Sequence, residues 1–226
     1  MLAEQLIQFY RQLQPPSPLP KGVSVLYPQN DPAVLKVVSD FFRKYYSDNS
    51  PRKLIFGINP GRYGAGITGI NFTAPRQLKS DCGIDHPFDD SSELSAEFVY
   101  EVINRYGSPA LFYGDYFLSS ISPLGYVKDG RNLNYYDEPV LQKAVTPFIN
   151  DCFDKQLLLN VDKKHCICIG GEKNFRFFKA LNEQRRNKGL LCFGEITALP
   201  HPRFILQYRR KEKETYIQQY LKVLSA

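Results

Sequence analysis

One stretch of the chain, Leu54 to Phe72, has the residue types that a pocket for a planar, hydrogen-bonding ligand would need. Its sequence is LIFGINPGRYGAGITGINF, a short apolar run followed by a segment with five glycines. Glycines at this density let the backbone approach another molecule closely, because no Cβ intervenes. The same stretch carries the amide side chain of Asn59, directly before Pro60, and two aromatic rings, Tyr63 and Phe72. We therefore expect this stretch to line a pocket for a ligand such as a nucleobase.

The elements that must position these residues alternate along the chain. Hydrophobic periodicity and turn residues predict helices near 2–13, 32–45, 92–106, 139–159, 171–186 and 214–224, and strands near 54–56, 110–118, 165–169 and 190–199. Strands that alternate with helices predict an α/β fold with three layers, α/β/α, and a mainly parallel central sheet. The chain has no internal repeat and no long linker, so residues 1–226 are expected to form a single domain.

Three loops are expected at the carboxyl ends of these strands, where open α/β sheets bind ligands. They cover residues 57–72, 119–135 and 200–210. The third begins with the sequence PHPR, which places His201 directly after a strand. We expect the three loops to converge on one crevice.

Composition limits the classes of protein that the chain can belong to. Apolar residues make up 43% and charged residues 23% of 226 residues, which is typical of a globular protein. No apolar run approaches the roughly 20 residues of a membrane span, so we expect no membrane association. The five cysteines have no disulfide or metal-binding spacing, which indicates free thiols in a reducing compartment and thus an intracellular, cytoplasmic location.

A basic cluster near the C-terminus predicts an anionic partner. The net charge is +6, and five basic residues fall between 203 and 213: Arg203, Arg209, Arg210, Lys211 and Lys213. Such a cluster can hold the phosphates of a nucleic acid. The same run also contains Glu212 and Glu214, so a solvated helix start is the alternative interpretation.

Four segments resemble the single-strand-selective monofunctional uracil-DNA glycosylases, a branch of the uracil-DNA glycosylase superfamily. GINPGRYGAGITGINF resembles the family motif G-M-N-P-G-P-F-G-x-x-x-T-G-x-x-F, and SPLGYVKDGRNL resembles C-P-L…S-G-R-N-L. CICIGGEKN corresponds loosely to an apolar strand with a glycine turn, and LPHPR resembles L-x-H-P-S-P-R. The resemblance spans residues 54 to about 210. It implies a DNA glycosylase in base excision repair that hydrolyses the bond between uracil and deoxyribose.

The resemblance also implies roles for individual residues. Asn59 falls on the residue that positions the attacking water, and His201 falls on the catalytic histidine that binds a base oxygen. Phe72 falls on the ring that stacks on the flipped base, while Gly61 and Tyr63 fall on the wall near the C5 edge of the base.

DNA-binding roles follow for the segment after His201. The wedge that fills the space left by the base is expected at Arg203 or, since the motif is shortened, at Phe204, Tyr208 or Arg209, and the basic residues up to Arg210 and Lys211 would hold phosphates.

The second loop departs from the family at the residue that reads the base edge. The family has an asparagine there, whereas this chain has Ser120. A serine hydroxyl either donates or accepts and lacks the fixed amide pattern that matches uracil. Other deaminated bases, such as xanthine or hypoxanthine, therefore become plausible substrates.

These residues suffice for a metal-free hydrolysis. A loose transition state puts positive charge on the sugar and negative charge on the departing base, so an amide that orients water can replace a carboxylate base. A histidine that donates to the base oxygen contributes about 3 kcal/mol, as in an oxyanion hole. Base flipping costs a few kcal/mol, which stacking on Phe72 offsets in part. We expect no cofactor, no metal and a monomeric enzyme.

Simpler interpretations exist for each residue taken alone. Asn59 before Pro60 can be a turn residue, His201 between two prolines a structural one, and Ser120 a capping residue. The acidic group at Asp85, His86, Asp89 and Asp90 lacks metal-ligand spacing. Two rival functions remain, a non-catalytic nucleic-acid-binding protein on the same fold and a hydrolase of small nucleosides.

Overall fold

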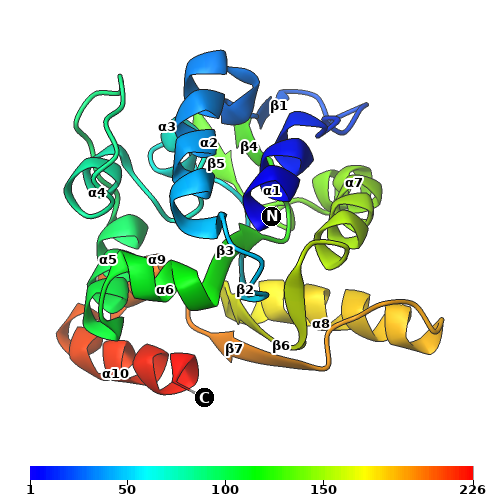
Figure 1. Ribbon diagram of the computed structural model, residues 1–226. Helices are drawn as coiled ribbons and strands as arrows, with labels where there is room; N and C mark the ends of the chain where they lie inside the picture. Colours follow the sequence, from blue (N-terminus) through cyan, green and yellow to red (C-terminus); the bar gives the residue numbers. More distant parts are fainter. Residues whose placement is uncertain (226) are drawn as a thin grey trace.

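The computed structural model describes residues 1–225, and its centre is a parallel sheet of four strands (Figure 1). Their spatial order is β3 (Tyr116–Ser120), β2 (Arg52–Gly57), β6 (Val161–Ile169) and β7 (Glu195–Leu199). All three pairings are parallel. The carboxyl ends of all four strands therefore lie at one edge of the sheet.

Helices cover both faces of this sheet, which confirms the predicted three-layer α/β fold. Phe56 in β2 packs with its ring against Phe153 and Phe178, from α7 (Pro139–Leu157) and α8 (Gly171–Asn187). The preceding residue, Ile55, lies on the opposite face with apolar residues of α5 (Leu94–Tyr106), α6 (Pro109–Asp115) and α10 (Lys213–Leu224). Successive strand residues point to opposite faces, so β2 is buried on both sides.

The remaining elements surround this core. They are α1 (Leu2–Arg11), β1 (Val23–Leu26), the 3-10 helix η1 (Pro28–Asn30), α2 (Pro32–Tyr46), α3 (Ala65–Thr68), α4 (Pro75–Ser80), β4 (Gly125–Lys128), β5 (Arg131–Leu133), α9 (Pro202–Tyr208) and the 3-10 helix η2 (Arg210–Glu212). Helix α2 begins as predicted, because the Asp31 side chain accepts a hydrogen bond from the amide of Ala33 and Pro32 occupies the first turn. Within residues 1–225, no helix is both long and apolar enough to cross a membrane.

Three predicted elements differ in the structure. Residues 110–118, predicted as one strand, divide into α6 and β3, because the Ser108 side chain caps a helix that has Pro109 in its first turn. The strand predicted over 190–199 begins only at Glu195. The helix predicted near 139–159 ends at Leu157 as α7 and has Pro147 in its interior.

Two predicted loops also contain regular structure. The loop at 119–135 includes a β-hairpin, β4–β5, which turns at Asp129-Gly130, and β1 pairs with β4 to complete a small antiparallel sheet. Both turn residues have positive φ, as a tight hairpin turn requires. The loop at 200–210 is mostly helix α9.

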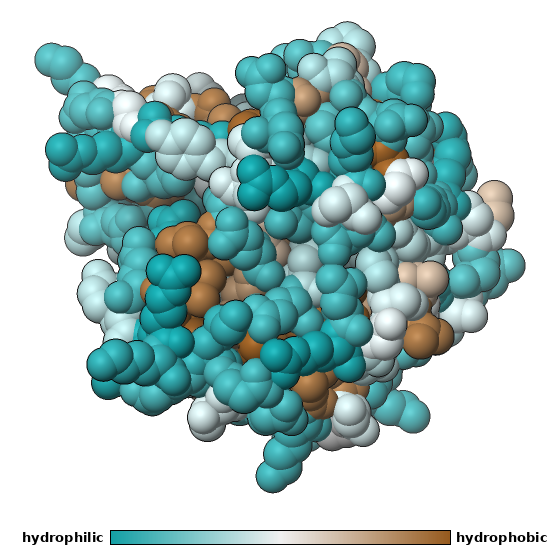
Figure 2. Space-filling view, turned by 90° about the vertical axis from the view of Figure 1, so that its left-hand side faces the viewer, coloured by the Kyte–Doolittle hydropathy of each residue, from teal (hydrophilic) through white to brown (hydrophobic). Residues whose placement is uncertain are grey.

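The molecular face shown in Figure 2 is mainly hydrophilic, with apolar side chains visible between polar ones. This pattern is usual for a protein whose apolar residues are largely used in its core.

Candidate active site

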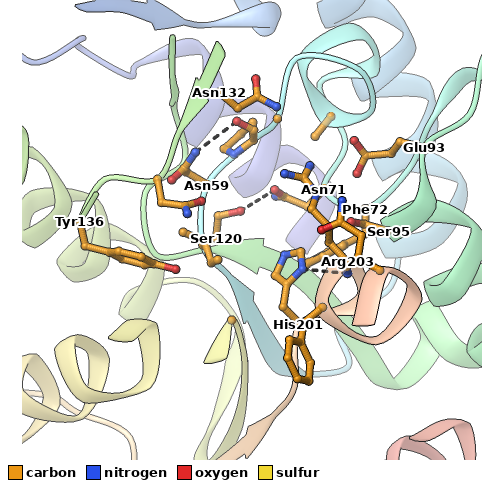
Figure 3. Close-up of a pocket in the computed structure, with 18 of the residues that line it drawn as sticks. Asn59, Asn71, Phe72, Glu93, Ser95, Ser120, Asn132, Tyr136, His201 and Arg203 are labelled. Carbon is orange, nitrogen blue, oxygen red and sulfur yellow. Dashed lines mark hydrogen bonds between the residues drawn. The ribbon is translucent and has the colours of Figure 1, made fainter. Parts of the chain in front are cut away.

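One cavity of about 270 Å³ lies at the carboxyl edge of the sheet (Figure 3). Each of the three predicted loops contributes to its walls, through Asn59 and Phe72, Ser120, and His201 respectively. The predicted convergence of the loops is therefore confirmed. The volume is at the small end of the range for ligand pockets, which suits a single flat base better than a larger molecule.

The wall that carries Phe72 is a tight turn after α3. The buried Thr68 hydroxyl donates to the carbonyl of Thr73 at 2.6 Å and accepts from the amide of Ile70 at 3.1 Å, which ties the two ends of the turn together. Phe72 has a φ of 54°, in the left-handed region that non-glycine residues rarely adopt. Such strain persists only where surrounding contacts hold it, and it is commonest at functional sites.

Gly57, the last residue of β2, makes room for the Phe72 ring. A Cβ at Gly57 would lie 2.8 Å from two ring carbons of Phe72, closer than real Cβ contacts come. The ring lies beside that of His201, with centroids 6.1 Å apart and planes at 46°. The position of the Phe72 ring thus depends on the absence of a side chain at Gly57.

Asn59 is held in one orientation by three backbone groups. Its Nδ2 donates to the carbonyls of Leu133 (3.1 Å) and Pro60 (3.3 Å), and its Oδ1 accepts from the amide of Tyr135 (3.0 Å). The carbonyls can only accept, so they fix the amide nitrogen, and Oδ1 keeps a second lone pair for another donor. A water molecule in the cavity is a suitable donor.

His201 precedes helix α9 and caps it. Its Nδ1 accepts the amide proton of Arg203 at 3.1 Å. In the neutral imidazole, the proton must then be on Nε2, which leaves that atom as a donor. Burial, and secondarily the positive charge of Arg203, lower the pKa of His201 to about 4, so the ring is neutral near pH 7.

Ser120 ends strand β3 and is almost completely buried at the cavity wall. Its hydroxyl donates to Oδ1 of Asn71 at 2.6 Å. Asn71 is buried as well and also lines the cavity, next to Phe72 in the turn. Two polar side chains from different loops therefore form one unit.

The rim of the cavity is charged and aromatic. Arg203, Phe204 and Tyr208 of α9 line it, and the two rings lie with centroids 5.8 Å apart. Both rings are exposed, as a group that contacts DNA would be. Glu93 lies near Arg203 and also lines the cavity. Burial raises the pKa of Glu93, and the positive charge of Arg203 opposes that effect.

Some residues of the predicted site lie elsewhere. Tyr63 is 56% exposed and does not line the cavity but an adjoining depression, which shares Glu93 and Arg203 with it. The guanidinium of Arg62 lies 4.7 Å from the centre of the Tyr63 ring. Arg209, Arg210 and Lys211 are exposed beyond α9 and do not line the cavity. Gly61 does line it, and a Cβ there would lie 3.2 Å from Nδ2 of Asn132.

The sequence analysis does not anticipate every lining residue, and the missed ones include Asn71, Glu93, Asn132 and Tyr136. Asn71 directly precedes Phe72, and Asn132 lies within the GRNL segment, so their positions in the motifs were a usable signal. Glu93 and Tyr136 come from segments without a motif, and only the tertiary structure brings them to the cavity.

In the acidic segment between α4 and α5, His86 has a structural role. Nε2 of His86 lies 2.8 Å from the carbonyl of Pro75, and its Nδ1 accepts from the amide of Phe88 at 3.2 Å. Among residues 1–225, no group of three or more His, Cys, Asp or Glu side chains is arranged to hold a metal ion.

The geometry of the cavity suits hydrolysis of a bond to a flat leaving group. Asn59 can orient a water, Phe72 offers a stacking face, and Nε2 of His201 can donate to a group that gains negative charge. A donor placed in advance at such a position stabilises the transition state more than the ground state.

Comparison with known proteins identifies the family. The family model for the uracil DNA glycosylase superfamily matches residues 43–225. A solved structure described as wild-type Pedobacter heparinus SMUG2 is 39% identical over 99% of this chain and 97% of its own, with a TM-score of 0.93. A comparison with curated proteins finds no match. The chain therefore belongs to the uracil DNA glycosylase superfamily, in its SMUG-type branch.

Proposed function

We propose that this chain removes uracil and other deaminated bases from DNA through the cavity lined by Asn59, Phe72, Ser120 and His201. Membership of the superfamily makes it a hydrolase of the DNA glycosylase type, which acts in base excision repair. The roles of the individual residues are inferred from their contacts. The observation that carries the proposal is the fixed orientation of the two polar groups, the Asn59 amide and the His201 imidazole.

In the proposed reaction the target nucleotide is flipped out of the duplex, and its base stacks on Phe72. The bond between the base and C1′ of the sugar breaks first, and its electron pair leaves with the base. Nε2–H of His201 donates a hydrogen bond to a base oxygen and stabilises the developing anion. A water that donates one hydrogen bond to Oδ1 of Asn59 then attacks C1′ and becomes the sugar hydroxyl. Its second proton passes to solvent, and the released base anion takes up a proton from solvent.

The proposal places DNA along helix α9. Arg203, Phe204 and Tyr208 border the cavity and are positioned to occupy the gap that the flipped base leaves. The exposed Arg209, Arg210 and Lys211 follow directly and would contact phosphates. Tyr63, which is exposed and does not line the cavity, would reach only DNA outside it.

Single-turnover excision of uracil from a labelled oligonucleotide tests the proposal. We expect Asn59→Ala to slow excision about 100-fold, because the attacking water loses its orientation. We expect His201→Ala to slow it about 100- to 1,000-fold, because one preorganised donor is lost. Matched controls are Asn104→Ala, on the exposed face of α5, and His165→Ala, which bonds Thr197 away from the cavity.

Both controls should excise at the wild-type rate, and all variants should show the wild-type circular dichroism spectrum. Full activity in Asn59→Ala or in His201→Ala would contradict the proposed mechanism. DNA binding without release of any deaminated base by the wild-type protein would contradict the proposed function.

A further inference from the structure

The buried contact between Ser120 and Asn71 decides which hydrogen-bonding group the pocket offers to a base. The Ser120 oxygen lies 2.6 Å from Oδ1 of Asn71, and the two side chains are 2% and 6% exposed. A serine hydroxyl has one proton and two lone pairs. If its proton is committed to Asn71, only lone pairs remain for a ligand.

The orientation of the Asn71 amide determines where that proton goes. Nδ2 of Asn71 lies 3.4 Å from the carbonyl of Leu118 and 3.3 Å from the hydroxyl of Tyr10. A phenol hydroxyl can donate or accept, but a backbone carbonyl can only accept, so the amide nitrogen must face Leu118. Oδ1 then faces Ser120, and an acceptor in that place requires the serine to donate.

The short distance supports the same assignment. A separation of 2.6 Å is within the range for O–H···O bonds and below the usual 2.7–3.2 Å of N–H···O bonds. If the amide were reversed, Nδ2 would face Ser120 at this distance, and Oδ1 would face the Leu118 carbonyl, where two acceptors would repel each other.

We propose that Asn71 is a positioning residue that makes the Ser120 oxygen a pure acceptor, so that the pocket selects bases with a ring N–H at this edge. This inference rests on the proposed function and names its substrate class. Uracil and deaminated purines carry such an N–H beside a carbonyl. Cytosine carries an unprotonated ring nitrogen there, which would place one acceptor against another.

The Ser120–Asn71 pair would thus replace the amide that reads the base edge elsewhere in the family. Asn71 supplies the fixed orientation, and Ser120 supplies the atom that contacts the base. The loss of one such hydrogen bond corresponds to roughly a 2- to 13-fold change in affinity.

The test measures binding without chemistry. Duplexes carry 2′-fluoroarabino nucleotides, whose glycosidic bond resists hydrolysis, with either uracil or cytosine as the target base. The dissociation constants of both duplexes give a base preference for each variant. Excision of uracil from an ordinary duplex by the wild-type protein is measured in parallel.

Two substitutions should lower the base preference for opposite reasons. Asn71→Leu, which keeps the branched heavy-atom skeleton of asparagine but has no acceptor, releases the Ser120 proton and should improve cytosine binding about fivefold. Ser120→Ala removes the acceptor and should weaken uracil binding by a similar factor. In the Ser120→Ala background, Asn71→Leu should change the preference no further.

Tyr10→Phe is the matched control. It removes the other side-chain partner of Asn71 but leaves the Leu118 carbonyl, which fixes the amide. It should lower thermal stability and keep the wild-type base preference. A purely structural role for Asn71 would instead weaken both duplexes equally, and that result would overturn the inference.

The proposed function and the role of Asn71 give different results when they fail. If the wild-type protein does not excise uracil, the proposed function fails. If it excises uracil but Asn71→Leu keeps the wild-type preference, or changes it equally in the Ser120→Ala background, only the role of Asn71 fails.

Discussion

His201 faces the pocket as a neutral imidazole, and this state follows from its burial and from its contacts with Arg203. The amide of Arg203 occupies Nδ1, and the guanidinium of Arg203 disfavours a second positive charge beside it. Asn59 is fixed in the same way, by backbone groups of the segment at 133–135. At both residues the chemistry depends on which side-chain atom carries a proton. Hydrogen bonds to backbone groups determine which atom that is.

We expect His201 to titrate near pH 4 in the folded protein, far below its ordinary value. The neutral donor is therefore present throughout pH 5–8, and protonation of His201 should contribute no acid limb to the excision rate in that range. NMR titration of the three histidine rings checks this, with the His201 signal assigned by its loss in His201→Ala. A His201 pKa at or above 6.5 would contradict it.

The same shift links His201 to stability. The pKa in the folded state is lower than in the unfolded state, so the contribution of the neutral ring is complete above about pH 6.5 and is lost as pH falls towards 4. Arg203→Gln removes the repulsive charge and should raise the pKa of His201 while burial keeps it below 6.5. Arg176→Gln, on the exposed face of α8, is the control and should leave the pKa unchanged.

At the scale of elements, the pocket depends on how strand β2 ends. Gly57 leaves the space that the Phe72 ring fills, and the turn at 68–73 holds Phe72 in its unusual backbone conformation. Asn71 and Phe72 are consecutive, so one turn supplies both the stacking face and the group that orients Ser120.

We expect Gly57→Ala to displace the Phe72 ring, because the new Cβ would lie 2.8 Å from it. Binding of uracil-containing DNA should weaken by about tenfold, because part of one stacking contact is lost. Gly114→Ala in α6 is the control, since a Cβ there meets nothing within 4 Å and alanine favours a helix. Equal binding by wild-type and Gly57→Ala proteins would show that the ring has room to move.

The sequence is sufficient to predict the layers of the fold, because buried parallel strands and amphipathic helices have different periods. It does not reveal that residues 110–118 divide into a helix and a strand, because the apolar run there is compatible with both kinds of structure. The sequence Asp129-Gly130 is typical of a tight hairpin turn, and it indicates the β4–β5 hairpin within the segment predicted as a loop.

The site was predictable where a motif carries it and not elsewhere. Asn59, Phe72, Ser120 and His201 lie in the cavity, as the motifs indicate. Tyr63 follows the same motif but points outward, because side-chain direction in a glycine-rich loop depends on backbone angles that the sequence does not fix. Glu93 reaches the rim through tertiary contacts alone.

At the scale of the whole molecule, charge is distributed to favour DNA on one side of the cavity. The net charge is +6, and exposed basic residues follow helix α9, beyond the rim formed by Arg203. Several acidic residues lie in the segment between α4 and α5. We therefore expect a duplex to be attracted to the α9 side, where its phosphates would meet compensating charge.

We expect the double substitution Arg210→Gln with Lys211→Gln to weaken DNA binding equally for uracil-containing and undamaged duplexes. The slope of log K against log salt should become shallower by up to about 2, because two phosphate contacts are lost. Lys164→Gln with Lys188→Gln makes the same change in net charge at exposed residues of β6 and the end of α8. An unchanged salt slope in the Arg210/Lys211 variant, or an equal change in the Lys164/Lys188 variant, would rule out specific contacts of Arg210 and Lys211 with phosphates.

Helix α1 lies outside the segment that the family model matches, yet its Tyr10 hydroxyl contacts Asn71, while Gln29 from η1 donates to the carbonyl of Gly69 in the same turn. We therefore expect the N-terminal segment and the pocket to unfold together. Amide protons in the turn at 68–73 should exchange with solvent only through openings that also detach α1. A single proteolytic cut in residues 12–22 would then loosen a site far along the chain from the cut.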